Sequence, residues 1–211
     1  MSTICKILVG SIDADRIEFL IRSHMADAFD CEIEKSEQEW PAAQDDDHFI
    51  GDFSDPTLFC IKVAAESFTE IHYNSFSPNE ALCETLSRET KAPVVVNIYQ
   101  STAEACYWAY YLDGKALRII ESGDGETTRN EGALLVFETA PLGYNIGTED
   151  DPFIVFDSDD MEEYNRHVGI DARVYHQLDS GWTVLKRKPT TASSPPKTTA
   201  KGGKKTWWKF W

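Results

Sequence analysis

ACYWAYYLDGKALRII, residues 105–120, contains two apolar runs that are separated by the dipeptide Asp113-Gly114. Both central residues of a type I′ turn need a positive φ, which Asp and Gly tolerate, so this dipeptide between apolar runs is a strong signal for a β-hairpin. We therefore expect antiparallel strands at about 105–112 and 115–121. The fold should contain an antiparallel sheet that extends outward from this hairpin.

Other apolar runs predict further strands. Residues 94–99, VVVNIY, form a continuous apolar run that is typical of a central strand. Strands are also expected at about 4–9, 31–35, 57–64, 68–76 and 133–138, and residues 172–175 and 182–186 are expected to form a closing strand pair. Strands outnumber helices and neighbouring strands join through short turns. The sequence therefore predicts an α+β fold with a mainly antiparallel sheet of six or more strands, covered by two to three helices.

Local signals predict where two of these helices begin and end. Apolar residues recur at helical spacing from about 14 to 29, and Asp13 precedes them as an N-cap. Another helix should follow a cap at Asp157 or Ser158 and stop at Gly169, because glycine tolerates the conformation in which many helices end.

A capping box is expected at the start of the remaining helix. In Ser77-Pro78-Asn79-Glu80, serine would occupy the cap, proline the first helical position, and glutamate the position three residues after the cap. This helix should stop before Pro93.

The charge of the chain is unevenly distributed. The last 26 residues, from Lys186, hold eight Lys/Arg and no Asp or Glu, which leaves 12 basic against 36 acidic side chains in residues 1–185. A body this acidic should repel phosphate, so we expect it not to bind nucleic acid directly. A basic protein partner, such as a toxin or a nucleic-acid enzyme, fits its charge better. Acidity that serves solubility alone is the alternative interpretation.

Composition divides the chain into three parts. Residues 1–187 are interpreted as one acidic globular domain. Residues 188–206 are interpreted as a flexible linker, because they consist almost entirely of Thr, Ser, Pro, Lys, Gly and Ala. Residues 207–211 form an aromatic and basic terminal motif.

The terminal motif is a candidate binding segment. Tryptophan anchors dominate many protein interfaces, which favours a docking peptide. Tryptophan also prefers the membrane interface, and each lysine adds about 1 kcal/mol on an anionic leaflet, so a peripheral membrane adaptor is an alternative. The tail could also fold back onto the acidic body. The candidate residues are Lys204, Lys205, Trp207, Trp208, Lys209, Phe210 and Trp211.

A stretch rich in carboxylates is the candidate binding surface of the body. Such a surface could offer the Lys/Arg groove of a nucleic-acid enzyme a substitute for phosphate, and charge complementarity of this kind speeds association. Negative charge at a helix N-terminus is the simpler interpretation of part of it. The candidate residues are Asp150, Asp151, Asp159, Asp160, Glu162 and Glu163.

A metal-dependent enzyme or metal-binding protein is the alternative hypothesis. It would use the Asp/Glu clusters at 121–126 and 149–163, since hard cations prefer carboxylate oxygens, although the stretch 149–163 lacks the spacing of the twelve-residue calcium loop. The chain has no Gly-x-Ser-x-Gly, zinc-spaced histidines or phosphate loop. Catalytic groups can also come from distant parts of a chain, so the absence of a local motif does not exclude an enzyme. We expect no catalytic residue, no metal ligand and no cofactor.

The hairpin segment resembles a pattern in small uncharacterised bacterial proteins. Its features are an aromatic strand that turns at Asp113-Gly114, an arginine (Arg118) on the returning strand, and a Gly-x-x-Leu-x-x-Glu segment that starts at Gly132. Some of these proteins are immunity proteins of polymorphic toxin systems, which neutralise a partner by binding it. The resemblance covers about residues 94–140 and implies an inhibitor rather than an enzyme.

The expected location follows from the cysteines and the hydropathy. Five widely spaced cysteines without a Cys-x-x-Cys pair are typical of a reducing compartment. The N-terminus lacks a signal-peptide core, and no stretch has the length of a membrane span. We expect a cytoplasmic binding protein, peripheral to the inner membrane face if the tail contacts lipid.

Overall fold

The Asp113-Gly114 turn forms as predicted. Asp113 and Gly114 have φ angles of 50° and 77°, and they join β6 (Ala105–Leu112) to β7 (Lys115–Gly123). The two strands pair antiparallel, with one shift of register close to the turn. The positive φ angles match the right-handed twist of the two strands, which is why this turn can be read from the sequence.

The computed structural model describes residues 3–28, 32–38, 43, 48–64, 67–123, 126–139, 156–173 and 181–188. Besides β6 and β7, its strands are β1 (Thr3–Val9), β2 (Glu32–Gln38), β3 (Leu58–Ala64), β4 (Phe68–Tyr73), β5 (Val94–Gln100), β8 (Glu126–Gly132) and β9 (Trp182–Lys188). All nine described strands form one antiparallel sheet in the order β2-β9-β3-β4-β1-β5-β6-β7-β8. This confirms the predicted α+β fold.

The first strand of the chain lies in the interior of the sheet. β1 pairs with β4 on one side and with β5 on the other, and residues 4–9 are buried. The edge strands β2 and β8 are instead polar, with the sequences EIEKSEQ and ETTRNEG. Charged side chains on an edge strand hinder pairing with another sheet, so the apolar strands are kept inside.

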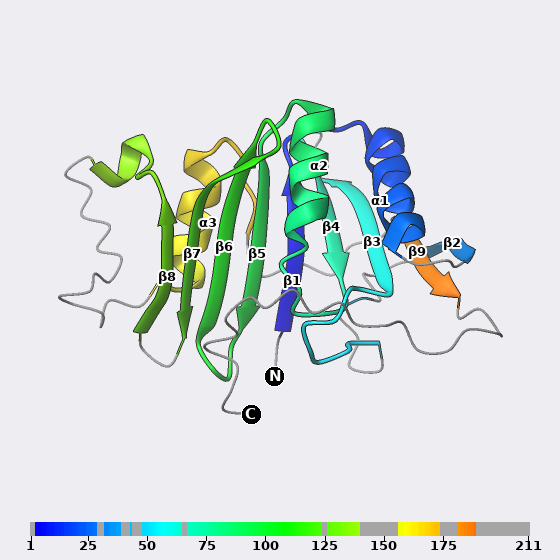
Figure 1. Cartoon of the computed structure of the whole chain (residues 1–211), viewed down its shortest axis with the longest axis horizontal. Coiled ribbons are helices and arrows are strands. Elements are labelled where there is room, and N and C mark those ends of the chain that lie inside the picture. Colours follow the sequence, from blue (N-terminus) through cyan, green and yellow to red (C-terminus); the bar gives the residue numbers. More distant parts are fainter. Residues whose placement is uncertain are drawn as a thin grey trace.

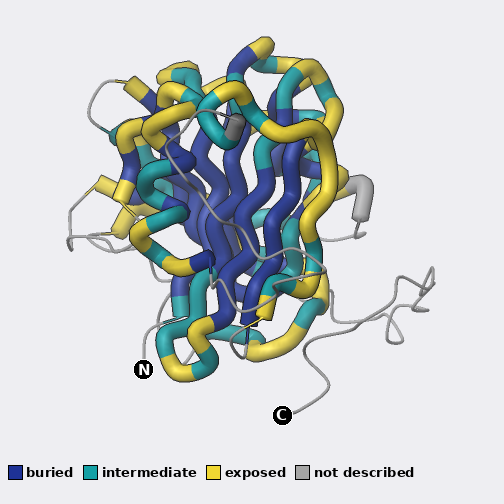
Figure 2. Tube along the Cα trace, turned by 90° about the vertical axis from the view of Figure 1, so that its left-hand side faces the viewer, coloured by how far each residue is buried: buried dark blue, intermediate teal, exposed yellow. Residues whose placement is uncertain are grey.

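Among the described residues, three α-helices cover the two faces of the sheet, as Figure 1 shows. α1 (Ala14–Ala28) and α2 (Glu80–Thr90) lie on one side, which we call the first face, and α3 (Ser158–His167) lies on the second face. Figure 2 shows the buried strands between the more exposed outer segments. α1 is capped as predicted, because the backbone N–H of Arg16 donates to Asp13 Oδ1 at 3.0 Å.

Each face has its own apolar core. On the first face, Ile7 of β1 packs with Ile17 of α1 and Leu82 of α2. On the second face, Leu8 packs with Trp108 of β6, and Met161 and Tyr164 of α3 belong to the same cluster. Because side chains alternate along a strand, successive residues of β1 serve opposite cores.

The predicted capping box of α2 is wrong. The helix begins at Glu80, and its N-cap is Asn79, which has a φ of 53° and makes no side-chain cap hydrogen bond. Ser77 Oγ instead accepts from the backbone N–H of Asn79 at 3.4 Å. The hydroxyl is used inside the turn, so the cap moves two residues along the chain. The helix ends before Pro93, as predicted.

Residues 133–138 do not form the predicted strand. The strand next to β7 is the polar segment β8, and residues Val136–Thr139 form the short 3-10 helix η2. Gly132 leaves β8 with a φ of 91°, and Glu138 then accepts hydrogen bonds from Arg118 Nε and Nη2 at 2.8–3.1 Å. Both side chains are buried. An unpaired buried Arg118 would cost more than the β-propensity of this segment supplies.

The predicted strand at 172–175 is not found in its described part. Ala172 and Arg173 are outside any strand, and residues 174–175 lie outside the described residues. The predicted strand at 182–186 exists as β9, but it pairs with β2 and β3.

A polar cluster interrupts the apolar packing of the second face. Lys6 Nζ of β1 donates to Glu70 Oε1 of β4 at 3.0 Å and also to the carbonyl of Arg173. His72 Nε2 lies 2.8 Å from the same Glu70 oxygen. The three side chains are at most 3% exposed. Since a buried charge is costly unless it is paired, Glu70 is the partner that permits Lys6 in the middle of the sheet.

Gly132→Ala should destabilise the protein strongly. An added Cβ would lie 2.1 Å from the carbonyl oxygen of Leu117 at a φ of 91°, so overlap and backbone strain together should lower the free energy of unfolding by about 3 kcal/mol. Gly51→Ala is the matched control, because its φ is 73° but nothing lies within 4 Å of the added atom. It should cost only about 1 kcal/mol. Urea denaturation measures both, and equal losses would contradict the close approach.

Candidate functional site

α3 carries the described part of the predicted acidic surface. Its N-cap is Asp157, whose side chain accepts from the backbone N–H groups of Asp159 and Asp160 at 2.8 and 3.1 Å. Asp160 completes a capping box by accepting from the backbone N–H of Asp157 at 3.1 Å. This confirms the predicted cap and gives Asp160 a structural role, while Asp159 is exposed. The carboxylate of Asp160 therefore takes part in the helix cap, whereas the neighbouring Asp159 is exposed to solvent.

The remaining predicted residues of α3 are half-buried. Glu163 pairs with Arg166 and with His167, whose Nε2 lies 3.1 Å from its carboxylate, and Glu162 is its neighbour on the helix. Burial raises the pKa of Asp160, and the nearby charges of Asp157 and Asp159 act in the same direction. Such a shift indicates that the carboxylates are crowded and incompletely compensated.

Buried polar contacts hold α3 in place beneath these carboxylates. Trp108 Nε1 of β6 donates to Asn165 Oδ1 at 2.9 Å, and Tyr164 donates to Glu138 Oε1 at 3.1 Å. Ser122 Oγ of β7 donates to the carbonyl of Phe156 at 2.6 Å, directly before the cap. These bonds fix both the rotation and the position of the helix, so its outer side is a preformed surface.

The segment that contains α3 carries mostly negative charge. Residues 157–171 contain six Asp/Glu side chains and one arginine, Arg166. Asp150 and Asp151, the other predicted members, lie outside the described residues, as does the whole predicted tail site from Lys204 to Trp211. The described carboxylates lie on or next to α3, on the second face, and we call them the α3 surface: Asp157, Asp159, Asp160, Glu162, Glu163 and Asp171.

A second carboxylate cluster lies on the first face, around Glu121. Glu121 of β7 stands between Tyr107 of β6 and Arg129 of β8 in one row across the sheet. Arg129 contacts Glu80 of α2 at 3.3 Å and Glu131 of β8 at 2.9 Å. The cluster thus combines three carboxylates with one guanidinium.

Glu121 is the unusual member of this cluster. It is 8% exposed, and its carboxylate has no hydrogen bond or ion pair within the described part of the chain. Burial raises the pKa of Glu121 to about 7, against the opposing charge of Arg129, and the charges of Glu131 and Glu80 add to the rise. Strongly shifted carboxyl groups are concentrated at functional sites, although ion-pair networks also produce them.

The described carboxylates of the sequence-predicted cluster at 121–126 differ in burial. Glu126 at the start of β8 is exposed, whereas Glu121 is buried, and residues 124–125 lie outside the described residues. Sequence reasoning missed Glu80, Arg129 and Glu131 as its neighbours. A period of two in the polar run of β8 was the available signal, because residues 129 and 131 must share a face.

The two carboxylate clusters occur at the same end of β7. Glu121 is adjacent in sequence to Ser122, whose side chain points to the opposite face and holds Phe156. Asp157 follows Phe156 and begins the α3 surface. Acidic groups therefore occupy both faces of the sheet at this end.

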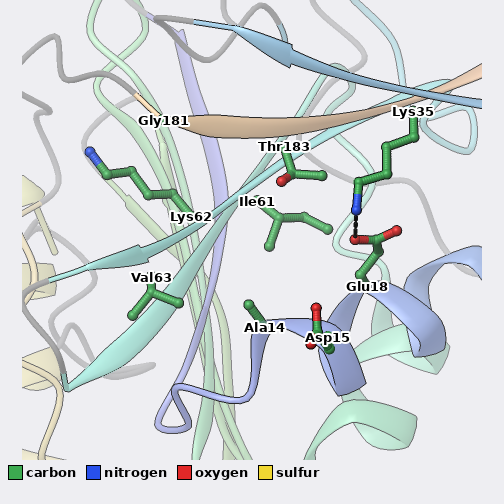
Figure 3. Close-up of a pocket in the computed structure, with 9 residues that line it drawn as sticks. All are labelled: Ala14, Asp15, Glu18, Lys35, Ile61, Lys62, Val63, Gly181 and Thr183. Atoms are coloured by element: carbon green, nitrogen blue, oxygen red, sulfur yellow. Dashed lines mark hydrogen bonds and ion pairs between the residues drawn. The ribbon is translucent and has the colours of Figure 1, made fainter.

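A pocket of about 440 Å³ lies between α1, β3 and β9 (Figure 3). Lys35 Nζ lies 2.7 Å from Glu18 in its lining, while Lys62 points away over the ring of Trp182. Its size is in the range of small-molecule sites, but it brings together none of the predicted site residues. The lining residues are Ala14, Asp15, Glu18, Lys35, Ile61, Lys62, Val63, Gly181 and Thr183.

The described residues contain no metal-binding arrangement and no membrane-crossing helix. No three His, Cys, Asp or Glu side chains among them are grouped so that they could hold a metal ion. None of the described helices combines the length and the apolar character needed to cross a bilayer.

Comparison with known proteins adds no relative. No family model, curated protein or solved structure matches the chain. The resemblance of residues 94–140 to bacterial immunity proteins stays a prediction. Three of the residues that carry it are linked in the structure, because Arg118 binds Glu138 across the turn at Gly132.

Asp157→Ala should lower the stability of the protein, whereas Asp159→Ala should change it little. Asp157 accepts two backbone hydrogen bonds at the start of α3, and loss of such a cap costs about 1 kcal/mol. Asp159 is exposed, so its carboxylate contributes only weak charge interactions with the helix dipole and with Asp160. Thermal unfolding of the two variants measures the difference, and an equal effect would contradict the assigned cap.

Glu121→Gln should stabilise the protein at pH 8 and leave its stability unchanged at pH 4. The folded pKa of about 7 lies above the unfolded value of about 4.3, so protonated Glu121 contributes stability that is lost as the pH rises between these values. Glutamine removes this loss, which should raise the free energy of unfolding at pH 8 by about 2 kcal/mol. Urea denaturation at pH 4, 6 and 8 checks the trend. Glu126→Gln controls for the loss of one charge on the same hairpin.

Proposed function

We propose that this protein is a non-catalytic, cytoplasmic binding protein of the immunity or inhibitor type. Its α3 surface would cover a basic site on a protein partner. The observation that supports this proposal is the combination of a firmly held helix with six carboxylates against one arginine in residues 157–171.

A held helix binds better than a mobile one. Ordering a flexible segment costs free energy on association, and the bonds from Trp108 and Tyr164 have already restricted α3. The uncompensated charge adds long-range attraction, which raises the association rate with a basic partner and selects against acidic ones.

The chemistry of the partner follows from the spacing of charge. Successive carboxylates along a helix can substitute for successive phosphates, so a groove of Lys and Arg side chains on a nucleic-acid enzyme or toxin would suit the α3 surface. The basic tail would contribute a second contact, with another protein or with the inner membrane face, since it combines lysines with three tryptophans.

Charge reversal on α3 tests this proposal. Asp159→Lys with Glu162→Lys should abolish capture of a basic protein from native lysate, and should weaken its affinity for that purified protein at least about tenfold. Wild-type binding should weaken with salt. Asp157 and Asp160 are left intact so that the cap survives.

Glu32→Lys with Glu37→Lys on β2 is the matched control. Both positions are exposed, and the substitutions change the net charge by the same amount. This control should bind like the wild-type protein. If both double variants lose binding equally, the effect is one of total charge, and the α3 surface is not the site.

A further inference from the structure

We infer that Glu121 is a receptor for one guanidinium group, which an arginine of the partner inserts beside Tyr107 and Arg129. The inference depends on the proposed function only for the source of that arginine. It concerns the first face of the sheet, which the α3 surface does not include.

The carboxylate of Glu121 makes no direct polar contact among the described residues, although the charge of its cross-strand neighbour Arg129 acts on it. Glu121 is more than nine-tenths buried, yet no hydrogen bond or ion pair to its side chain exists within the described ranges. A buried ionised carboxylate is unfavourable unless it is paired. A cation that reaches the small exposed part of Glu121 would supply the missing partner.

The surrounding charges favour a cation. Arg129 donates to Glu131 at 3.0 Å and to Glu80 at 3.3 Å, so its single positive charge is shared between two other carboxylates. Glu80 also accepts from the hydroxyl of Tyr107 at 3.5 Å. When Glu121 is ionised, it outnumbers Arg129 by two charges together with Glu80 and Glu131, which favours one additional cation.

The chemistry of the site favours guanidinium over ammonium. A guanidinium group is planar and forms paired hydrogen bonds with a carboxylate. Glu121 supplies the carboxylate, and its cross-strand neighbour Tyr107 is only 2% exposed, so the paired hydrogen bonds rather than stacking on the ring would hold the cation. Arg129 shows that a guanidinium already fits between carboxylates on this face.

Binding at this site should depend on pH near neutrality. Because the pKa of Glu121 is about 7, the carboxyl group carries a proton for part of the time at pH 7. Guanidinium binds the ionised form and so displaces this proton. Affinity should therefore increase as the pH rises from about 6 to 8, with Tyr107, Glu80, Glu131 and Arg129 as the groups that face Glu121.

A titration of the full-length protein tests the inference without knowledge of the partner. Carbon-13 NMR would follow the Glu121 carboxylate from pH 4 to 9 in 50 mM guanidinium chloride and in 50 mM tetramethylammonium chloride. Guanidinium should lower the apparent pKa of Glu121 by about half a unit relative to tetramethylammonium, since only the planar cation can pair with it. The exposed Glu104 should respond equally to both salts. Identical Glu121 curves in the two salts would overturn the inference.

Glu121→Gln supplies the control for assignment. The variant should lose the resonance that titrates near neutrality, and guanidinium should then perturb Tyr107 no more than tetramethylammonium does. The outcomes separate this site from the α3 surface. If guanidinium lowers the pKa of Glu121 but the α3 double variant still captures the partner, the Glu121 site is supported and the proposed function is rejected. If guanidinium has no effect but the α3 double variant no longer captures the partner, the proposed function is supported and the Glu121 site is rejected.

Discussion

The ion pair between Lys6 and Glu70 constrains the rest of the structure, because it lies where the N-terminal strand enters the middle of the sheet. A slip of β1 by one residue would turn Lys6 into the apolar core beneath α1 and α2, away from Glu70 and the Arg173 carbonyl. The buried charge therefore penalises every register but one. Once β1 is in place, β4 and β5 pair on its two sides, and the remaining strands add outward to polar edges.

A second buried ion pair, between Arg118 and Glu138, connects the sheet to the candidate binding surface. Glu138 accepts from Arg118 and from Tyr164, so one carboxylate joins β7, η2 and α3. The α3 surface is consequently tied to the hairpin on which the sheet is built. Without this link, the carboxylates of α3 would lie on a helix held mainly by apolar contacts, which specify its position less well.

The two buried ion pairs and the Glu121 cluster differ in how far the buried charge is compensated by a direct partner. Lys6 with Glu70 and Arg118 with Glu138 are closed, since each charge meets its opposite at 3.0 Å or less. Glu121 is left open among carboxylates that Arg129 only partly neutralises. An open site of this kind lowers stability at neutral pH, and such a loss is tolerated where a ligand restores it.

Local chemistry allowed much of the fold to be read from the residues. The positive φ angles of Asp113 and Gly114, the cap at Asp157 and the apolar period of α1 depend on neighbours within a few positions, and all three were confirmed. Contacts between distant residues determined the rest. Residues 133–138 were expected to be a strand because of their β-propensity, but Glu138 leaves that course to meet Arg118. The acidic composition indicated a binding surface, yet which carboxylates cap a helix, which face solvent and which one is buried unpaired depended on pairing across the sheet, where long-range electrostatics and burial outweigh local preference.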